Sequence, residues 1–128
     1  MTRLKLMRLL ILGWVAIIIV TPSPARGHAF SIRSEPRVGR TISASPARVT
    51  IWFDGELETA FSTIAVYNAA KQRVDKGDGR VNSADATVLE VDIPPLPPGG
   101  YRVYWRVVAK DTHRTEGDFS FTVEGKSP

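Results

Sequence analysis

The sequence contains no cysteine. This absence excludes disulfide cross-links, thiolate metal ligands, a cysteine nucleophile and a lipid anchor on an N-terminal cysteine. Methionine is almost absent as well, because the 128 residues include two, Met1 and Met7. The chain beyond these two positions therefore has no thioether ligand for a soft metal ion.

Acidic residues are missing from the first 27 positions, which hold four of the 17 Lys and Arg residues. Beyond that segment 13 basic residues face 13 acidic ones, so the formal net charge of +4 belongs to the leading segment. A nucleic-acid-binding domain carries its basic excess on the folded part of the chain. The charge balance therefore predicts no nucleic-acid partner.

Long hydrophobic runs are also lacking. The longest, Leu9 to Val20, has twelve residues, whereas a transmembrane helix needs about 20. Arg3, Lys5 and Arg8 precede the run, and Thr21–Pro24 ends it. This order of basic, apolar and helix-breaking residues is typical of a secretory signal peptide. We predict that residues 1–27 form such a signal; an uncleaved N-terminal anchor is the alternative.

Small residues around the end of this segment permit three cleavage sites, after Ala25, Gly27 or Ala29. Cleavage after Gly27 makes His28 the first residue of the mature protein. Export predicts a periplasmic location with no membrane insertion after cleavage. The periplasm is oxidising, yet the chain has no disulfide, so its core must stabilise the fold alone.

Residues 28–124 show short runs of alternating apolar and polar residues, separated by Gly, Pro, Asn and Asp. No stretch has a convincing helical period. The predicted strands lie near residues 28–34, 48–53, 61–67, 72–74, 89–93, 101–107 and 119–123. About seven short strands in about 100 residues predict an all-β, Greek-key, immunoglobulin-like β-sandwich. A β-barrel is the alternative. We expect residues 125–128 to form a flexible tail and the protein to be a monomer.

The mature chain contains only two histidines, His28 and His113. As the N-terminal residue, His28 offers its amine and its ring Nδ1, which together close a six-membered chelate on one metal ion. Asp111 and His113 are two residues apart at a strand end, so their side chains are expected to point the same way. Three nitrogens and one oxygen in a tetragonal arrangement favour Cu(II), then Ni(II), over Zn(II). Because the ligands must be deprotonated, the affinity for the metal ion is expected to decrease as the pH decreases.

Each part of this pattern also has an ordinary interpretation. A lone Asp-x-His is usually a polar turn with a solvated imidazole. Asp54-Gly55-Glu56 is usually a solvated turn, although Glu56 is a candidate for an outer-shell contact to the metal site. Asp75, Asp78 and Asp85 lie near glycines but do not fit the EF-hand spacing, which favours a plain hairpin loop. Trp105 is expected in the core, and Trp52 on the opposite face, either exposed or half-covered.

Three landmarks resemble the CopC family of periplasmic copper-binding proteins. They are His28-Ala29-Phe30 followed by Ser34-x-Pro36-x-x-Gly39; Leu96-x-x-Gly99-x-Tyr101-x-Val103-x-Trp105-Arg106; and Asp111-Thr112-His113 with Gly117 and Phe119-x-Phe121-x-Val123. The resemblance covers nearly all of residues 28–123. It implies a Greek-key sandwich with a Cu(II) site at one end, whose ligands are His28, Asp111 and His113.

The sequence also departs from the family pattern. It lacks the methionine-rich Cu(I) loop of some members, which implies a Cu(II)-only protein. It has Ala109 where members often have serine. Some members are fused to a CopD-type membrane domain, so a separate inner-membrane CopD-type transporter is the expected partner.

The leading hypothesis is a copper carrier of the periplasm, not an enzyme, acting in copper homeostasis or resistance. Uptake and resistance would use the same site. One alternative is a copper monooxygenase-like enzyme with a histidine-brace site. The other is a metal-free immunoglobulin-like module that binds a partner, in which His28 and His113 are incidental.

Overall fold

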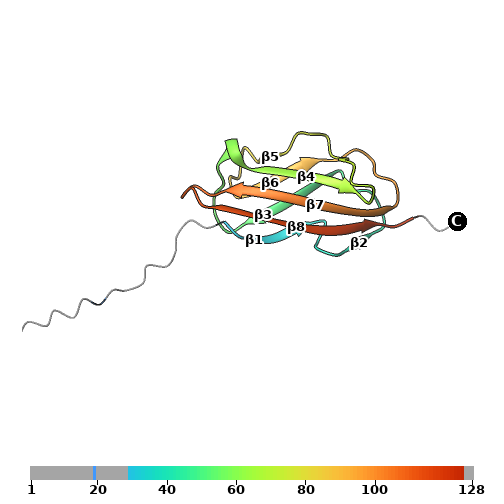
Figure 1. The fold of residues 1–128 in the computed structure, drawn as a ribbon, viewed down its shortest axis with the longest axis horizontal. Coiled ribbons are helices and arrows are strands. Elements are labelled where there is room, and N and C mark those ends of the chain that lie inside the picture. The colour runs from blue at the N-terminus through green and yellow to red at the C-terminus, as the bar shows by residue number, and fades with distance from the viewer. Residues whose placement is uncertain (1–18, 20–28, 126–128) are drawn as a thin grey trace, which may run out of the picture.

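The computed structural model describes Ile19 and residues 29–125. Two four-stranded sheets pack face to face (Figure 1). The first sheet has the order β1(Ser31–Glu35), β3(Arg48–Phe53), β6(Val88–Asp92), β5(Arg80–Val81). The second has the order β2(Thr41–Ile42), β8(Arg114–Val123), β7(Gly99–Val108), β4(Thr63–Asn68). The predicted all-β sandwich is confirmed, and the barrel alternative is wrong.

The core lies between the sheets and consists of the residues that alternate inward. Val49, Ile51 and Phe53 of β3 are at most 2% exposed. The same holds for Val103 and Val107 of β7, which are fully buried. Alternation predicted these faces correctly because a strand turns successive side chains to opposite sides of its sheet.

Trp105 and Trp52 occupy the two faces expected for them. The Trp105 ring packs against the core and meets Phe53 edge to face, with centroids 5.2 Å apart and planes at 78°. Trp52 is half-buried on the outer face of its sheet, where the guanidinium of Arg33 lies 3.9 Å from the ring centroid. This cation–π contact covers an indole that would otherwise lie open to solvent.

The strand predictions failed where a strand is defined by its hydrogen-bonded partner and not by a pattern of buried residues. The segment near residues 72–74 is not a strand and forms only an isolated bridge, Tyr67 to Arg73. β2 and β5 were missed because two residues carry no readable period. β2 pairs in parallel with β8, and β5 pairs antiparallel with β6.

The loop after β4 is also different from the expected hairpin, because it crosses from one sheet to the other. Asp75 and Asp78 of this loop are engaged within the fold: Asp75 accepts hydrogen bonds from main-chain N–H groups, and Asp78 binds Arg80 and the Asp92 N–H. Asp85 lies instead in the loop of the β5–β6 hairpin, where the predicted hairpin is present and its carboxylate binds Thr87. These contacts give the carboxylates a structural role.

A close approach within the β7–β8 hairpin explains the glycine at position 117. Gly117 pairs with Trp105, and a Cβ at Gly117 would lie 2.5 Å from Cζ2 and 2.8 Å from Cε2 of the indole. The indole thus occupies the space that any other residue would need.

Gly117→Ala is therefore expected to lower the free energy of unfolding by about 1–3 kcal/mol, the usual cost of overpacking. Urea denaturation measures this loss. Gly100→Ala in the same hairpin is the matched control, since a Cβ there meets nothing within 4 Å. Equal stability of the two variants would contradict the explanation.

Candidate metal centre

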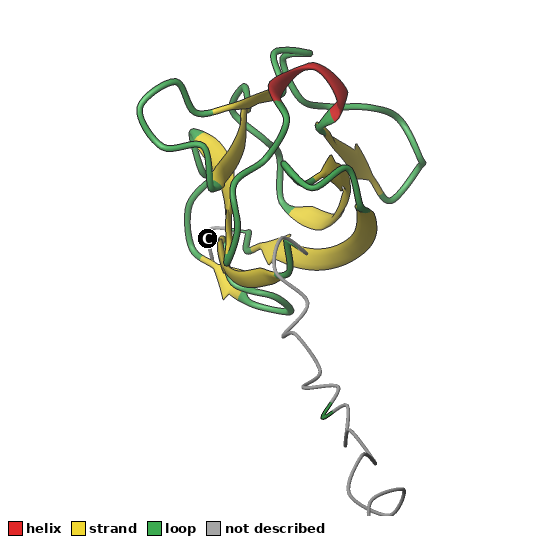
Figure 2. Cartoon of the chain, turned by 90° about the vertical axis from the view of Figure 1, so that its left-hand side faces the viewer, coloured by secondary structure: helices red, strands yellow, loops and turns green. Residues whose placement is uncertain are grey.

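The β7–β8 hairpin turns at one end of the sandwich, the left end in Figure 1. The first residues of β1 and the short 3-10 helix η2(Thr59–Phe61) lie at the same end. Figure 2 looks onto this end, with η2 at its upper rim. The candidate residues Asp111 and His113 belong to the hairpin turn.

The turn is a three-residue loop closed by two main-chain hydrogen bonds. The Ala109 N–H donates to the His113 carbonyl at 2.9 Å, and the Thr112 N–H donates to the Ala109 carbonyl at 2.9 Å. Thr112 has a φ of 74°. A left-handed third residue is typical of such loops, where glycine is the usual choice. Thr112 is β-branched, so its backbone conformation is unusual and strained.

This turn brings Asp111 and His113 together. The His113 N–H donates to Asp111 Oδ1 at 3.0 Å, and His113 Nδ1 lies 2.8 Å from Asp111 Oδ2. The sequence predicted their proximity correctly, but for the wrong reason. Alternation along an extended strand does not produce it; the left-handed Thr112 folds the chain back so that both side chains meet.

The separation of the two side chains fits a tetragonal metal ion as well as a hydrogen bond. Two ligands about 2.0 Å from a metal ion and at right angles to it are about 2.8 Å apart. The His113 side chain is 59% exposed and that of Asp111 is 22% exposed. The pair is therefore accessible from solvent.

The start of the domain is held beside this turn. The Thr115 hydroxyl donates to the Ala29 carbonyl at 2.8 Å. The next N–H, that of Phe30, donates to Asp54 Oδ1 at 2.7 Å, and the Asp54 N–H donates to the Phe30 carbonyl at 3.0 Å. Ala29 is completely buried. Sequence analysis missed these roles of Thr115 and Asp54, since nothing local distinguishes them from ordinary polar residues.

The other two candidate site residues are His28 and Glu56. His28 lies outside the described residues, as does the predicted signal peptide apart from Ile19. Glu56 is exposed, and its carbonyl accepts a hydrogen bond from the Lys110 N–H at 3.1 Å. Glu56 thus lies on the segment beside the turn, and a role for its carboxylate stays a prediction. Residues 29–125 contain no group of three or more His, Asp or Glu side chains placed to hold a metal ion.

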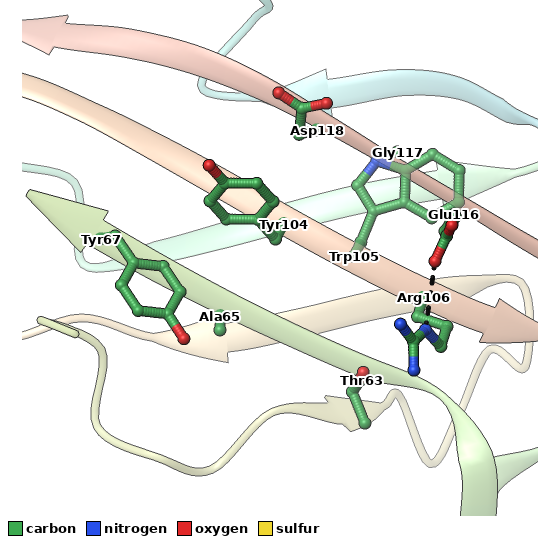
Figure 3. A pocket seen from close by; sticks show the side chains of 9 residues that line it. All are labelled: Thr63, Ala65, Tyr67, Tyr104, Trp105, Arg106, Glu116, Gly117 and Asp118. Atoms are coloured by element: carbon green, nitrogen blue, oxygen red, sulfur yellow. Dashed lines mark hydrogen bonds and ion pairs between the residues drawn. The ribbon is translucent and has the colours of Figure 1, made fainter. Parts of the chain in front are cut away.

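One hollow lies away from the turn, on the outer face of β4, β7 and β8. It has a volume of about 680 Å³, and its lining includes Tyr67, Tyr104 and the ion pair of Arg106 with Glu116 (Figure 3). Asp111 and His113 are not part of its lining.

Within the described residues there is also no helix that could cross a membrane.

Comparison with known protein families gives a match to the CopC domain over residues 31–124. The chain belongs to the CopC family. The match runs from β1 to the residue after β8, so it includes the whole sandwich. Membership of this family of binding domains agrees with the prediction that the chain is not an enzyme.

Individual relatives differ in length. Protein YobA of Escherichia coli K12 is 31% identical over 107 residues, which cover 83% of this chain and 86% of that protein. Copper resistance protein C of Pseudomonas syringae pv. tomato is 29% identical, with 78% and 83% covered. Copper transport protein CutJ of Bacillus subtilis is 27% identical over 86% of this chain. The matched region spans about a fifth, 21%, of CutJ.

Solved structures share the fold. CopC from Methylosinus trichosporium OB3b superimposes with a TM-score of 0.73 at 31% identity, covering 79% of this chain and 98% of that one. PcoC of Escherichia coli, described as a methionine-rich copper resistance protein, has a TM-score of 0.65 at 28% identity, covering 76% and 99%. Unlike PcoC, this CopC-family chain has methionine only at positions 1 and 7.

Proposed function

We propose that this protein is an exported carrier that binds one Cu(II) ion through His28, Asp111 and His113. His28 supplies its amine and its ring. The observation that carries the proposal is the paired Asp111 and His113 next to an anchored Ala29. The relatives' names, which refer to copper resistance and copper transport, support copper as the cargo.

Chain connectivity supports His28 as the third ligand. Consecutive Cα atoms are about 3.8 Å apart, so residue 28 stays close to the buried Ala29. The Ala29 carbonyl is bonded to Thr115, two residues beyond His113. A histidine at position 28 is therefore within reach of the Asp111–His113 pair, provided that cleavage after Gly27 frees its amine.

The donor set supports Cu(II) rather than Cu(I). Two imidazoles, an amine and a carboxylate are nitrogen and oxygen donors, which suit Cu(II), whereas Cu(I) prefers sulfur. No methionine or cysteine lies in residues 29–125. Four protein donors leave no open equatorial position, which suits carriage better than catalysis. The basic, apolar and helix-breaking order of residues 1–27 supports export to the periplasm.

A membrane-bound copper transporter of CopD type is the proposed partner. CutJ supports this pairing, because its CopC-like region is part of a longer protein named for copper transport. The carrier would deliver Cu(II) to the transporter or keep Cu(II) away from it.

The experiment is a native mass spectrum of the exported protein with one equivalent of Cu(II), since it reports the processed N-terminus and the bound metal together. We expect a chain that begins at His28 and retains one copper ion. A chain beginning at Arg26 or Phe30, or one that retains no copper, would contradict the proposal. Turnover of an oxidisable substrate by the copper-loaded protein would instead favour the enzyme alternative.

A further inference from the structure

One peptide group near the start of the domain is held from both ends. The carbonyl of the Ala29–Phe30 peptide accepts from the Thr115 hydroxyl at 2.8 Å, and its N–H donates to Asp54 Oδ1 at 2.7 Å. Thr115 belongs to β8, and Asp54 follows β3 in the opposite sheet. Each sheet therefore makes a hydrogen bond to this peptide, and the two bonds together restrict its rotation.

The Thr115 hydroxyl is not needed for the strand itself. Thr115 pairs with Val107 through the main chain, just as each other residue of β8 pairs with its own partner in β7. Valine has the same shape as threonine and at least as high a preference for strands. The hydroxyl adds to this only its bond to the Ala29 carbonyl, 86 residues away in sequence.

We propose that Thr115 is a positioning residue of the metal site. By fixing the Ala29–Phe30 peptide it restrains the chain next to the proposed ligand at position 28. The amine and ring of residue 28 then lose less freedom when they join Asp111 and His113 on the ion. This inference rests on the proposed Cu(II) site, and it assigns to Thr115 no contact with the ion.

Preorganisation of this kind raises affinity because the entropy of ordering the ligand is lost on folding rather than on metal binding. Contacts that orient metal ligands without touching the metal typically change affinity about 10-fold to 100-fold. Thr115→Val is expected to weaken Cu(II) binding by a factor in this range. At saturating Cu(II) its EPR spectrum should match that of the wild type, because the ligands are unchanged.

A measurement without metal tests the restraint on the Ala29–Phe30 peptide by itself. Amide hydrogen exchange at Phe30, followed by NMR in the absence of copper, is expected to be about 10-fold faster in Thr115→Val. Thr115→Ser retains the hydroxyl and should restore both slow exchange and tight Cu(II) binding. Thr122→Val is the matched control, because Thr122 is an exposed threonine near the other end of β8. It should leave exchange at Phe30 and Cu(II) affinity unchanged.

The outcomes separate this inference from the proposed function. If the wild type binds Cu(II) and Thr115→Val binds it equally well, the positioning role is wrong and the carrier proposal stands. If the wild type binds no Cu(II), both fail. An altered EPR spectrum in Thr115→Val would also overturn the inference, because it would mean that the set of ligands itself had changed.

Discussion

Replacing His113 by alanine is expected to weaken Cu(II) binding by more than about 100-fold, which exceeds the usual effect of outer-shell changes. The imidazole is one of three nitrogens in the proposed donor set, and its Nδ1 lies 2.8 Å from Asp111 Oδ2. Removing the ring leaves Asp111 without the neighbouring donor that completes the coordination plane. A competition titration with a chelator of known affinity measures the change.

The same substitution is expected to change the free energy of unfolding by no more than about 0.5 kcal/mol, as is usual for an exposed side chain. The ring is 59% exposed. The bonds that close the turn use the main chain of Ala109, Thr112 and His113, and alanine retains them. Urea denaturation of the metal-free protein checks this expectation.

Arg114→Ala is the matched control, since Arg114 is the exposed neighbour of His113. It should leave Cu(II) affinity within about threefold of the wild type. If His113→Ala bound Cu(II) as tightly as Arg114→Ala, His113 would not be a ligand and the proposed donor set would be wrong. The metal-free module would be the better description only if the wild type itself bound no Cu(II).

Asp75→Ala is expected to cause the largest loss of stability, about 3 kcal/mol, because it removes a buried acceptor from main-chain donors, while its ionic partner Arg73 is half exposed and stays hydrated. The Asp75 side chain has no solvent exposure. Its carboxylate accepts from the N–H of Val66 at 2.8 Å, from the N–H of Gly77 at 2.8 Å and from Arg73 Nε at 2.9 Å. Alanine would leave these donors without an acceptor at the edge of β4.

Urea denaturation at pH 7 measures this loss, with Asp85→Ala as the matched control. Asp85 also lies in a loop, where its carboxylate binds Thr87, but it is exposed. Its removal should cost clearly less than that of Asp75, because water can replace the hydrogen bonds of an exposed carboxylate. Equal losses in the two variants would mean that burial of the Asp75 carboxylate contributes nothing.

The contribution of Asp75 should also depend on pH. Burial by itself would raise the pKa of Asp75, but the hydrogen bonds from Arg73, Val66 and Gly77 outweigh it, so the pKa lies below its usual value. The unfolded chain takes up the proton at about pH 3.9. The stabilisation is therefore complete above this pH and is lost as the pH falls through the lower pKa of the folded state.

Comparing the wild type with Asp75→Asn between pH 7 and pH 3 tests this dependence. The asparagine variant cannot ionise at this position, so the stability difference between the two proteins should shrink below about pH 4. A difference that stays constant or grows as the pH falls would contradict the lowered pKa.

Apolar alternation identified most of the main strands, because burial repeats every second residue in β3, in β8 and along most of β7. It placed Val49, Ile51 and Phe53 on one face and Trp52 on the other, as the structure has them. Composition narrowed the choice of candidate metal ligands. The chain beyond residue 27 has no sulfur and two histidines, so Asp111 and His113 could be singled out as candidates before their geometry was known.

Tertiary structure decided the features that depend on partners distant in sequence. β2 is a strand only because β8 lies beside it, and Asp111 meets His113 only because Thr112 takes up a left-handed conformation. The bond from Thr115 to Ala29 spans 86 residues. A pattern along the chain records how each residue is buried, whereas such hydrogen bonds depend on how the two sheets pack, which no local pattern contains.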